Sequence, residues 1–267
     1  MDRYKKFMLI TGIFLIAITV VFLKIFVLNT KDVKNRSLIE KSKGELKSGS
    51  AEIKSGIGTI QPDHIVVKEF DFKLSESDKL IKDILLSSTD NKKIKGFFNF
   101  NDLILRFVSA VDNIAHEESP VKNLDFLEPF NKFIPEYKNG KYIISKKSYS
   151  RYDYFVTVFD SFSDKFLAET YLRSKKLIDK AYKKLGYGNT RFDDTLYEAM
   201  RVLLETPVIK GDIQLIKNVV SYKYANSNIE SLNRVQKHFI RLGQKNMVKV
   251  KKKIIGISSL LGFKLKI

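Results

Sequence analysis

The chain contains no cysteine, and this absence excludes several kinds of chemistry. Disulfide bonds and metal sites built from thiolates are excluded because both need cysteine sulfur. Bacterial lipoprotein processing, which modifies a cysteine, is excluded for the same reason. The absence does not identify a compartment, because proteins without disulfides occur on both sides of a membrane.

Catalytic and cofactor-binding motifs are also missing. The sequence has no G-x-S-x-G, Walker or dinucleotide-binding pattern. A zinc metalloprotease needs two histidines at positions i and i+4 of one helix, but His116 has no second histidine nearby. His64 and His238 lie far from it in the sequence. We therefore expect no catalytic residue, no metal and no cofactor, and we expect that the protein is not an enzyme.

Tryptophan is absent as well, while lysine, isoleucine and asparagine are abundant, as in proteins of AT-rich genomes. Lysine and arginine number 48 and aspartate and glutamate number 30, which gives a net charge of +18. Two interpretations of this charge stay open. It reflects AT-rich coding, or it serves a polyanionic partner such as nucleic acid, anionic lipid or an acidic envelope polymer.

The chain does have one long hydrophobic run, from Phe7 to Leu28, interrupted only by Lys24. As a helix it is about 33 Å long, enough to cross a hydrocarbon core of about 30 Å. It is longer than the core of a signal peptide, and no small-x-small cleavage site follows it. The sequence therefore predicts a short tail (1–6) and an uncleaved transmembrane anchor (7–28). Basic residues flank both ends, and their number does not favour export of the following domain.

The rest of the chain divides into a linker and a folded domain. Residues 29–74 mix lysine, glutamate, serine and glycine without apolar periodicity, so we expect a flexible linker. A short strand over 65–72 is an alternative for its last part. Residues 75–267 are predicted to form one mainly helical globular domain with a minor β element. The chain's twenty phenylalanines and twelve tyrosines support a sizeable core.

Apolar residues spaced by three and four positions predict the helices of this domain. Residues 141–145, after the turn at Asn139-Gly140, and residues 213–225 read as strands. Residues 120–140 read as irregular because they contain three prolines. The helices are expected to begin at Ser75 or Ser77, Asn101 or Asp102, Ser148 or Ser150, Asp164, Asp193 or Asp194, Asn226 or Ser227, and about Gln244.

Four phrases resemble, in the same order, a bacterial family of membrane-anchored proteins, the domain-of-unknown-function family DUF3014. They are RFVSAVDN (106–113), SYSRYDYF (148–155), AYKKLGYGNTRFDDTL (181–196) and YKYANSNIESLNRVQKHFIRLG (222–243). The resemblance covers roughly residues 75–258. It implies a short cytoplasmic start, one membrane helix and a mainly helical domain in the envelope of Gram-negative bacteria. It implies no activity, substrate, cofactor or site residue, but it favours a periplasmic domain.

Several polar residues stand inside otherwise apolar phrases. Such residues either line a cleft or form buried pairs that hold helices in register, and we favour the pairs. Asp193 and Asp194 stand at a predicted helix start, where paired carboxylates serve acid–base chemistry or cap the helix. We favour capping. The other candidate structural polar residues are Arg106, Asp112, Tyr152, Asp153 and Arg191.

The C-terminal segment is a basic amphipathic helix. Residues 241–267 carry eight basic side chains and no acidic one. Such a helix lies on an anionic membrane, or it is the last core helix with a basic solvated face, and we favour the core position. The apolar face is predicted to hold Met247, Val250, Ile254, Ile257 and Leu261. The candidate contacts to an anionic surface are Lys245, Lys249 and Lys252 on the opposite side, and Lys253 at the flank.

We expect from these observations a non-enzymatic, inner-membrane-anchored protein whose periplasmic domain acts as a binding or scaffolding module. Its partner would be anionic lipid, cell-wall polymer or an envelope protein. The first alternative is an enzyme that acts on an envelope glycan or peptide through carboxylates such as Asp193 and Asp194. The second is a domain on the cytoplasmic side that binds nucleic acid with steep salt dependence.

Overall fold

The computed structural model describes residues 65, 67–70, 73–79, 101–118, 132–188, 190–219 and 221–265. The predicted anchor (7–28), most of the predicted linker and the apolar part of the helix expected after Ser77 lie outside these residues. None of the helices within the described ranges combines the length and the apolar character that a bilayer crossing needs. What is described is mainly helical with one small antiparallel sheet, as predicted.

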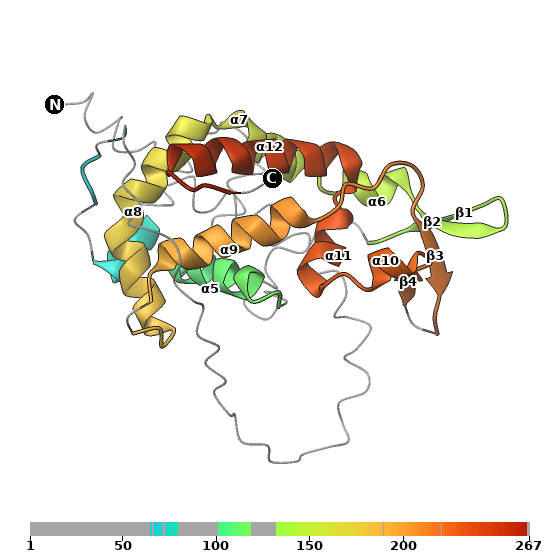
Figure 1. Cartoon of the computed structure of the whole chain (residues 1–267), viewed down its shortest axis with the longest axis horizontal. Helices are drawn as coiled ribbons and strands as arrows, with labels where there is room; N and C mark the ends of the chain where they lie inside the picture. The colour runs from blue at the N-terminus through green and yellow to red at the C-terminus, as the bar shows by residue number, and fades with distance from the viewer. Residues whose placement is uncertain are drawn as a thin grey trace, which may run out of the picture.

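Three helices form the centre of the fold: α5 (Leu103–Ala115), α8 (Asp164–Lys184) and α9 (Phe192–Glu205). Their aromatic side chains meet in the core, where the ring of Phe192 lies 5.7 Å from that of Phe107 on α5. The centre of the Phe192 ring also lies 5.3 Å from the centre of the Tyr182 ring on α8. The helices α7 (Asp153–Ser161) and α12 (Gly243–Leu260) pack over this centre (Figure 1).

Helix α5 carries the predicted apolar stripe, and a distant side chain caps its N-terminus. Asp102 has a left-handed backbone (φ 60°), and its side chain makes no capping hydrogen bond. Instead the carboxylate of Asp78 accepts hydrogen bonds from the backbone N–H groups of Asp102 and Leu103, the latter at 2.9 Å. The predicted start at Asn101 or Asp102 is confirmed, since α5 follows Asp102 directly, but the capping acceptor comes from a residue far away in the sequence.

The ends of α8 agree with the sequence, and the start of α9 does not. Ser163 accepts a hydrogen bond from the N–H of Phe166 and so caps α8. The sequence predicts that Gly186 ends the helix that begins at Asp164, and Gly186, with φ of 98°, does follow α8. Helix α9 begins one residue before Asp193, and no side chain caps it. The predicted capping role of Asp193 and Asp194 is wrong, since both lie within the first turn.

Two predicted helices are each divided in the structure. The helix expected from Ser148 or Ser150 consists of α6 (Lys146–Ser150) and α7, and Ser145 caps α6 by accepting from the N–H of Ser148. The helix expected from Asn226 or Ser227 consists of α10 (Ser227–Glu230) and α11 (Arg234–Ile240). Asn226 caps α10, as expected, and Asn233 caps α11.

The sheet contains β1 (Pro135–Lys138), β2 (Lys141–Ile144), β3 (Gln214–Lys217) and β4 (Tyr222–Tyr224), in that spatial order and all antiparallel. Asn139 and Gly140 both have positive φ in the turn from β1 to β2, which suits the twist of a two-residue hairpin. Strand β1 lies in a region that the prolines led us to interpret as irregular. The strand predicted over 213–225 is a second hairpin.

The chain contacts the helical core before residue 74. Phe70, inside the predicted linker, is 4% exposed, and its N–H donates to the carbonyl of Arg173 on α8 at 2.8 Å. The guanidinium of Arg173 lies 4.7 Å from the centre of the Phe70 ring. Glu69 pairs with Lys176 at 2.8 Å. Residues 69 and 70 are therefore packed against the middle of α8.

Candidate functional site

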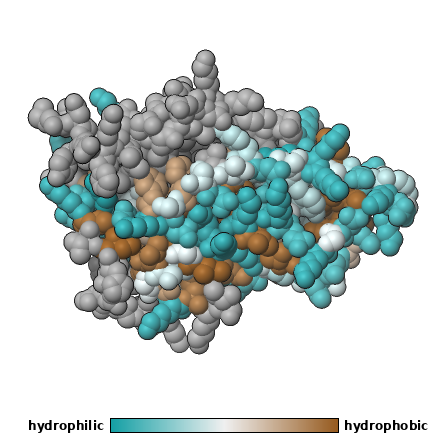
Figure 2. All heavy atoms as spheres, turned by 90° about the horizontal axis from the view of Figure 1, so that it is seen from above, coloured by the Kyte–Doolittle hydropathy of each residue, from teal (hydrophilic) through white to brown (hydrophobic). Residues whose placement is uncertain are grey.

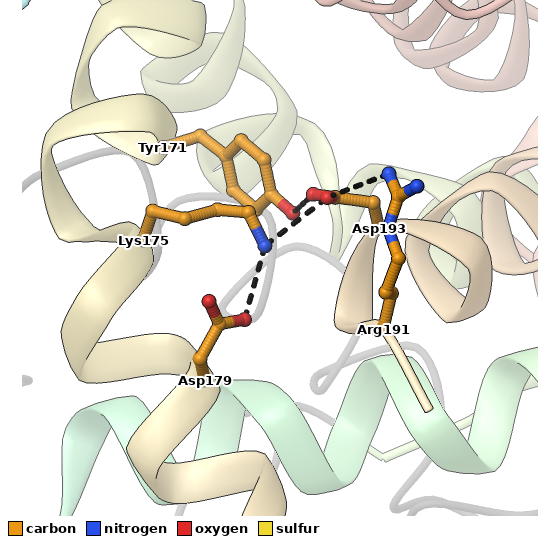
Figure 3. A network of polar contacts seen from close by, with 5 residues as sticks. All are labelled: Tyr171, Lys175, Asp179, Arg191 and Asp193. Carbon is orange, nitrogen blue, oxygen red and sulfur yellow. Dashed lines mark hydrogen bonds and ion pairs between the residues drawn. The ribbon is translucent and has the colours of Figure 1, made fainter. Parts of the chain in front are cut away.

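Asp193 is the centre of a buried polar network between α8 and α9 (Figure 3). It is 6% exposed and accepts a hydrogen bond from the hydroxyl of Tyr171. Lys175 lies 3.1 Å and Arg191 3.3 Å from its other oxygen. Lys175 also pairs with Asp179 at 3.0 Å. A buried carboxylate with three donors is fully compensated, so this arrangement joins the two helices.

The electrostatics of this network fix the direction of its main hydrogen bond. Burial, followed by the nearby Asp193 carboxylate, raises the pKa of the Tyr171 hydroxyl well above its usual value. The hydroxyl therefore stays protonated and donates to Asp193 throughout the physiological range. Lys175 reaches the surface, where it lines a hollow between residues 65–69 and α8.

Asp112 forms a second polar cluster at the C-terminal ends of α5 and α8. Its carboxylate accepts a hydrogen bond from the hydroxyl of Tyr187 at 3.1 Å, and Nδ1 of His116 lies 3.4 Å from its other oxygen. The Tyr187 ring stacks on Tyr182 at 4.6 Å. Burial is the largest influence on Asp112 and raises the pKa of its carboxyl. The cluster ties α5 to the turn that follows α8.

The other polar residues singled out from the sequence, Arg106, Tyr152 and Asp153, make contacts away from these two clusters. Arg106 donates to the carbonyl of Asn101 at 2.9 Å. Tyr152 is buried, and its hydroxyl accepts from Arg151. Asp153 accepts from the amide of Asn246 at 2.7 Å, which joins α7 to α12. The structure thus brings Arg191 and Asp193 together, but it does not gather the predicted polar residues in one cleft.

Two of the four lysines predicted to contact an anionic surface are engaged in ion pairs. Lys249 pairs with Asp160 at 3.1 Å. The side chain of Lys253 is only 11% exposed, pairs with Asp164 at 2.9 Å and donates to the carbonyl of Phe162 at 2.7 Å. The predicted apolar face is buried, as expected for a core helix: Met247, Val250, Ile254, Ile257 and Leu261.

The outward side of α12 carries a stripe of four exposed residues, Lys245, Val248, Lys252 and Ile255, which we call the α12 stripe. Val248 is 51% and Ile255 36% exposed. Neither lysine has an ion pair among the described residues. Figure 2 looks onto the side where α7 and α12 lie in Figure 1, and hydrophilic and hydrophobic residues adjoin on it. The helical pattern showed the buried face clearly but not these two exposed apolar residues.

A groove of about 750 Å³ lies between the β1–β2 hairpin, α6, residues 209–213 and the start of α12. We call it the hairpin groove. Isoleucines from four segments, together with Met247, give it an apolar floor, and Lys138, Lys146 and Lys147 stand along it. Neither Asp193 nor Asp194 lines it. No sequence signal pointed to this groove, because segments more than one hundred residues apart build it.

The described residues contain no group of three or more histidine, cysteine, aspartate or glutamate side chains placed to hold one ion. Nδ1 of His116 lies 3.4 Å from the carboxylate of Asp112.

Comparison with known proteins gives one match. The model of a family described as "Protein of unknown function (DUF3014)" matches residues 103–257, which are more than half of the chain. The match confirms the family resemblance that the four sequence phrases carried. No curated protein and no solved structure matches the chain.

Proposed function

Since the chain belongs to the DUF3014 family, we propose that it is a single-pass, membrane-anchored envelope protein with a non-enzymatic periplasmic binding or scaffolding domain. Residues 7–28 would anchor it in the inner membrane, and the segment up to about residue 68 would let the domain reach its partner. The α12 stripe is the observation that supports the binding role most directly. Its two lysines, which form no ion pair with any described residue, are exposed on a helix whose opposite face is part of the core.

The composition of the α12 stripe suits an anionic surface. Each lysine close to such a surface contributes about 1 kcal/mol, and exposed apolar side chains add to the binding when they are buried. Asp160 and Asp164 neutralise Lys249 and Lys253, so Lys245 and Lys252 are left to act. The partner would be a layer of anionic lipid head groups or an acidic cell-wall polymer.

The geometry of the carboxylates supports binding over catalysis. An enzyme acting on an envelope glycan or peptide would need Asp193 and Asp194 in an accessible cleft. Asp193 is buried with three donors, and neither residue lines the hairpin groove or the hollow beside α8. A domain that binds nucleic acid would have to lie on the cytoplasmic side of the membrane. The labelling experiment below determines on which side the linker lies.

The binding proposal can be tested with the full-length chain in nanodiscs of zwitterionic lipid and fluorescent vesicles rich in phosphatidylglycerol. The variant Lys245→Glu/Lys252→Glu should capture at least about tenfold fewer vesicles, given the contribution of about 1 kcal/mol per lysine. Lys217→Glu/Lys223→Glu makes the same change in net charge on β3 and β4 and serves as the control. Equal loss in both variants would mean that total charge, not the α12 stripe, governs capture.

The proposed orientation is tested by labelling. Because the chain has no cysteine, a Ser48→Cys variant offers a single thiol in the linker. A maleimide that crosses the outer but not the inner membrane should label this thiol in intact cells. Protection that disappears on lysis would place the linker in the cytoplasm and favour a nucleic-acid partner.

A further inference from the structure

The walls of the hairpin groove are held together by hydrogen bonds. Ile134, just before β1, accepts at its carbonyl from the hydroxyls of Ser145 (2.5 Å) and Ser148 (2.8 Å). Its N–H donates to the Ser148 hydroxyl at 2.9 Å. On the other side, the N–H of Ile144 donates to the carbonyl of Ile213 at 3.1 Å. The groove is therefore formed without a ligand, as most small-molecule sites are.

The floor of the groove is apolar and fits within the usual size of ligand sites. Its volume of about 750 Å³ lies inside the range of roughly 300–1,000 Å³ that holds small molecules. A hydrocarbon chain placed there would lie against aliphatic side chains, of which Ile134 is 51% exposed and most of the others are buried. These side chains are Ile134, Ile143, Ile144, Ile209, Ile213, Ile240 and Met247.

The polar groups along the groove are mostly donors without partners. Lys146 and Lys147 are exposed and form no ion pair within the described ranges. The Tyr149 hydroxyl makes no hydrogen bond to any described residue, and the same holds for the Gln244 amide. Burial raises the pKa of the Tyr149 hydroxyl above its usual value, so this group remains a donor.

The acidic groups of the groove do not cancel these donors. Asp212 pairs with Lys138 at 3.5 Å, although its charge also contributes, after burial and Tyr224, to the raised pKa of Tyr149. Glu136 on β1 is the second carboxylate among the lining residues. The donors Lys146, Lys147, Tyr149 and Gln244 outnumber this carboxylate. The groove is therefore suited to a ligand that carries a negatively charged acceptor.

We propose that the hairpin groove binds an anionic amphiphile, with its acyl chain along the isoleucine floor and its carboxylate or phosphate head group held by Lys146, Lys147 and Tyr149. A neutral hydrocarbon would leave these donors unused, and free phosphate would make no contact along the apolar lining. The site is separate from the α12 stripe, so this proposal and the proposed function can fail independently.

Photo-crosslinking of the full-length chain in zwitterionic nanodiscs tests the proposal. The probe is a palmitate analogue with a diazirine in its acyl chain, and mass spectrometry locates the label. We expect labelling on residues 134–149, 209–213 and 240–247. An excess of palmitate or of lysophosphatidic acid should compete with the label, and the stronger competitor identifies the head group as carboxylate or phosphate. A neutral monoacylglycerol of equal chain length should compete at least about tenfold less well, the value of one charge-assisted hydrogen bond.

Variants connect the labelling to the named residues. Lys146→Glu/Lys147→Glu should reduce groove labelling about tenfold or more, and Tyr149→Phe should reduce it less. Lys217→Glu/Lys223→Glu is the control of equal charge and should label as the unaltered chain does. The proposal is overturned by labelling outside the groove, by equal competition from the neutral lipid, or by labelling that Lys146→Glu/Lys147→Glu leaves unchanged. Displacement of the label by an acidic peptide alone would overturn it in favour of a protein partner.

Discussion

The hydroxyl of Tyr171 on α8 donates a hydrogen bond to the carboxylate of Asp193 on α9, and both residues are buried. The same carboxylate lies within ion-pair distance of Lys175 and Arg191. The buried Asp193 carboxylate thus joins α8 and α9, and the surrounding donors compensate its negative charge. Removing one partner leaves a buried charge less compensated, which is more costly than the loss of an exposed hydrogen bond.

Tyr171→Phe should therefore lower the free energy of unfolding by about 1–3 kcal/mol, because the Asp193 carboxylate loses a buried donor. Urea denaturation followed by circular dichroism measures this change. Tyr197→Phe is the matched control, since its hydroxyl is exposed and donates to the carbonyl of Lys264 at 3.4 Å. Equal effects in the two variants would contradict the role given to the network.

Gly243→Ala should destabilise the fold by about 3 kcal/mol or more. Gly243 has φ of 78°, and an added Cβ would lie 2.8 Å from the ring of Tyr149. Gly211, with φ of 81° and open space around it, is the control, and its substitution should cost about 1 kcal/mol. The difference in urea midpoint between Gly243→Ala and Gly211→Ala measures the steric part. No difference would mean that the Tyr149 ring moves aside freely.

Lys253→Met should cost more stability than Lys249→Met, although the two lysines are four residues apart. Lys253 is nearly buried and serves both the Asp164 carboxylate and the Phe162 carbonyl, so we expect a loss of about 1.5–3 kcal/mol. Lys249 forms a half-exposed pair with Asp160, worth about 1 kcal/mol or less. Thermal unfolding of both variants checks the order, and a reversed order would refute it.

His238 should make the fold less stable in mild acid. It is buried, and burial followed by Arg241, Lys237 and Arg234 lowers the pKa of its imidazole well below 6.5. The unfolded chain therefore binds a proton near pH 6.5 that the folded chain does not. As the pH falls below 6.5, the free energy of unfolding should decrease by up to about 1.4 kcal/mol per pH unit.

Urea midpoints at several pH values between 7.5 and 5.5 check this prediction, with His238→Gln as the comparison. The variant should show a shallower decrease than the unaltered chain, because the group that takes up the proton is gone. Parallel profiles would show that other groups cause the acid sensitivity.

The sequence predicted those elements whose signals are local. The apolar stripe of α5, the glycine after α8 and the Asn139-Gly140 hairpin turn all depend on residues within a few positions of each other. The five apolar residues of α12 at helical spacing left a core and a membrane position open, and the core position was favoured because the family resemblance extends through most of this helix. The family resemblance was equally accessible, because it rests on short phrases in order.

The features that the sequence did not show depend on distant residues. Asp78 caps α5 across more than twenty positions, so the sequence near Asn101 and Asp102 shows where the helix begins but not which side chain caps it. Lys249 and Lys253 looked like free surface charges because Asp160 and Asp164 are far from them in the chain. The hairpin groove combines segments whose proximity only the tertiary structure reveals.

The contact of Phe70 with Arg173 also determines how the fold would respond to mechanical tension. A pull from residues before 65 would reach the domain on the side of α8, where Ile65 and Phe70 pack, and would load the Phe70 backbone hydrogen bond. Burial of one phenylalanine side chain contributes about 1.5–3 kcal/mol, a small part of the stability of a domain. The segment would therefore peel away at low force, lengthen the reach of the chain, and leave the packing of α5, α8 and α9 intact.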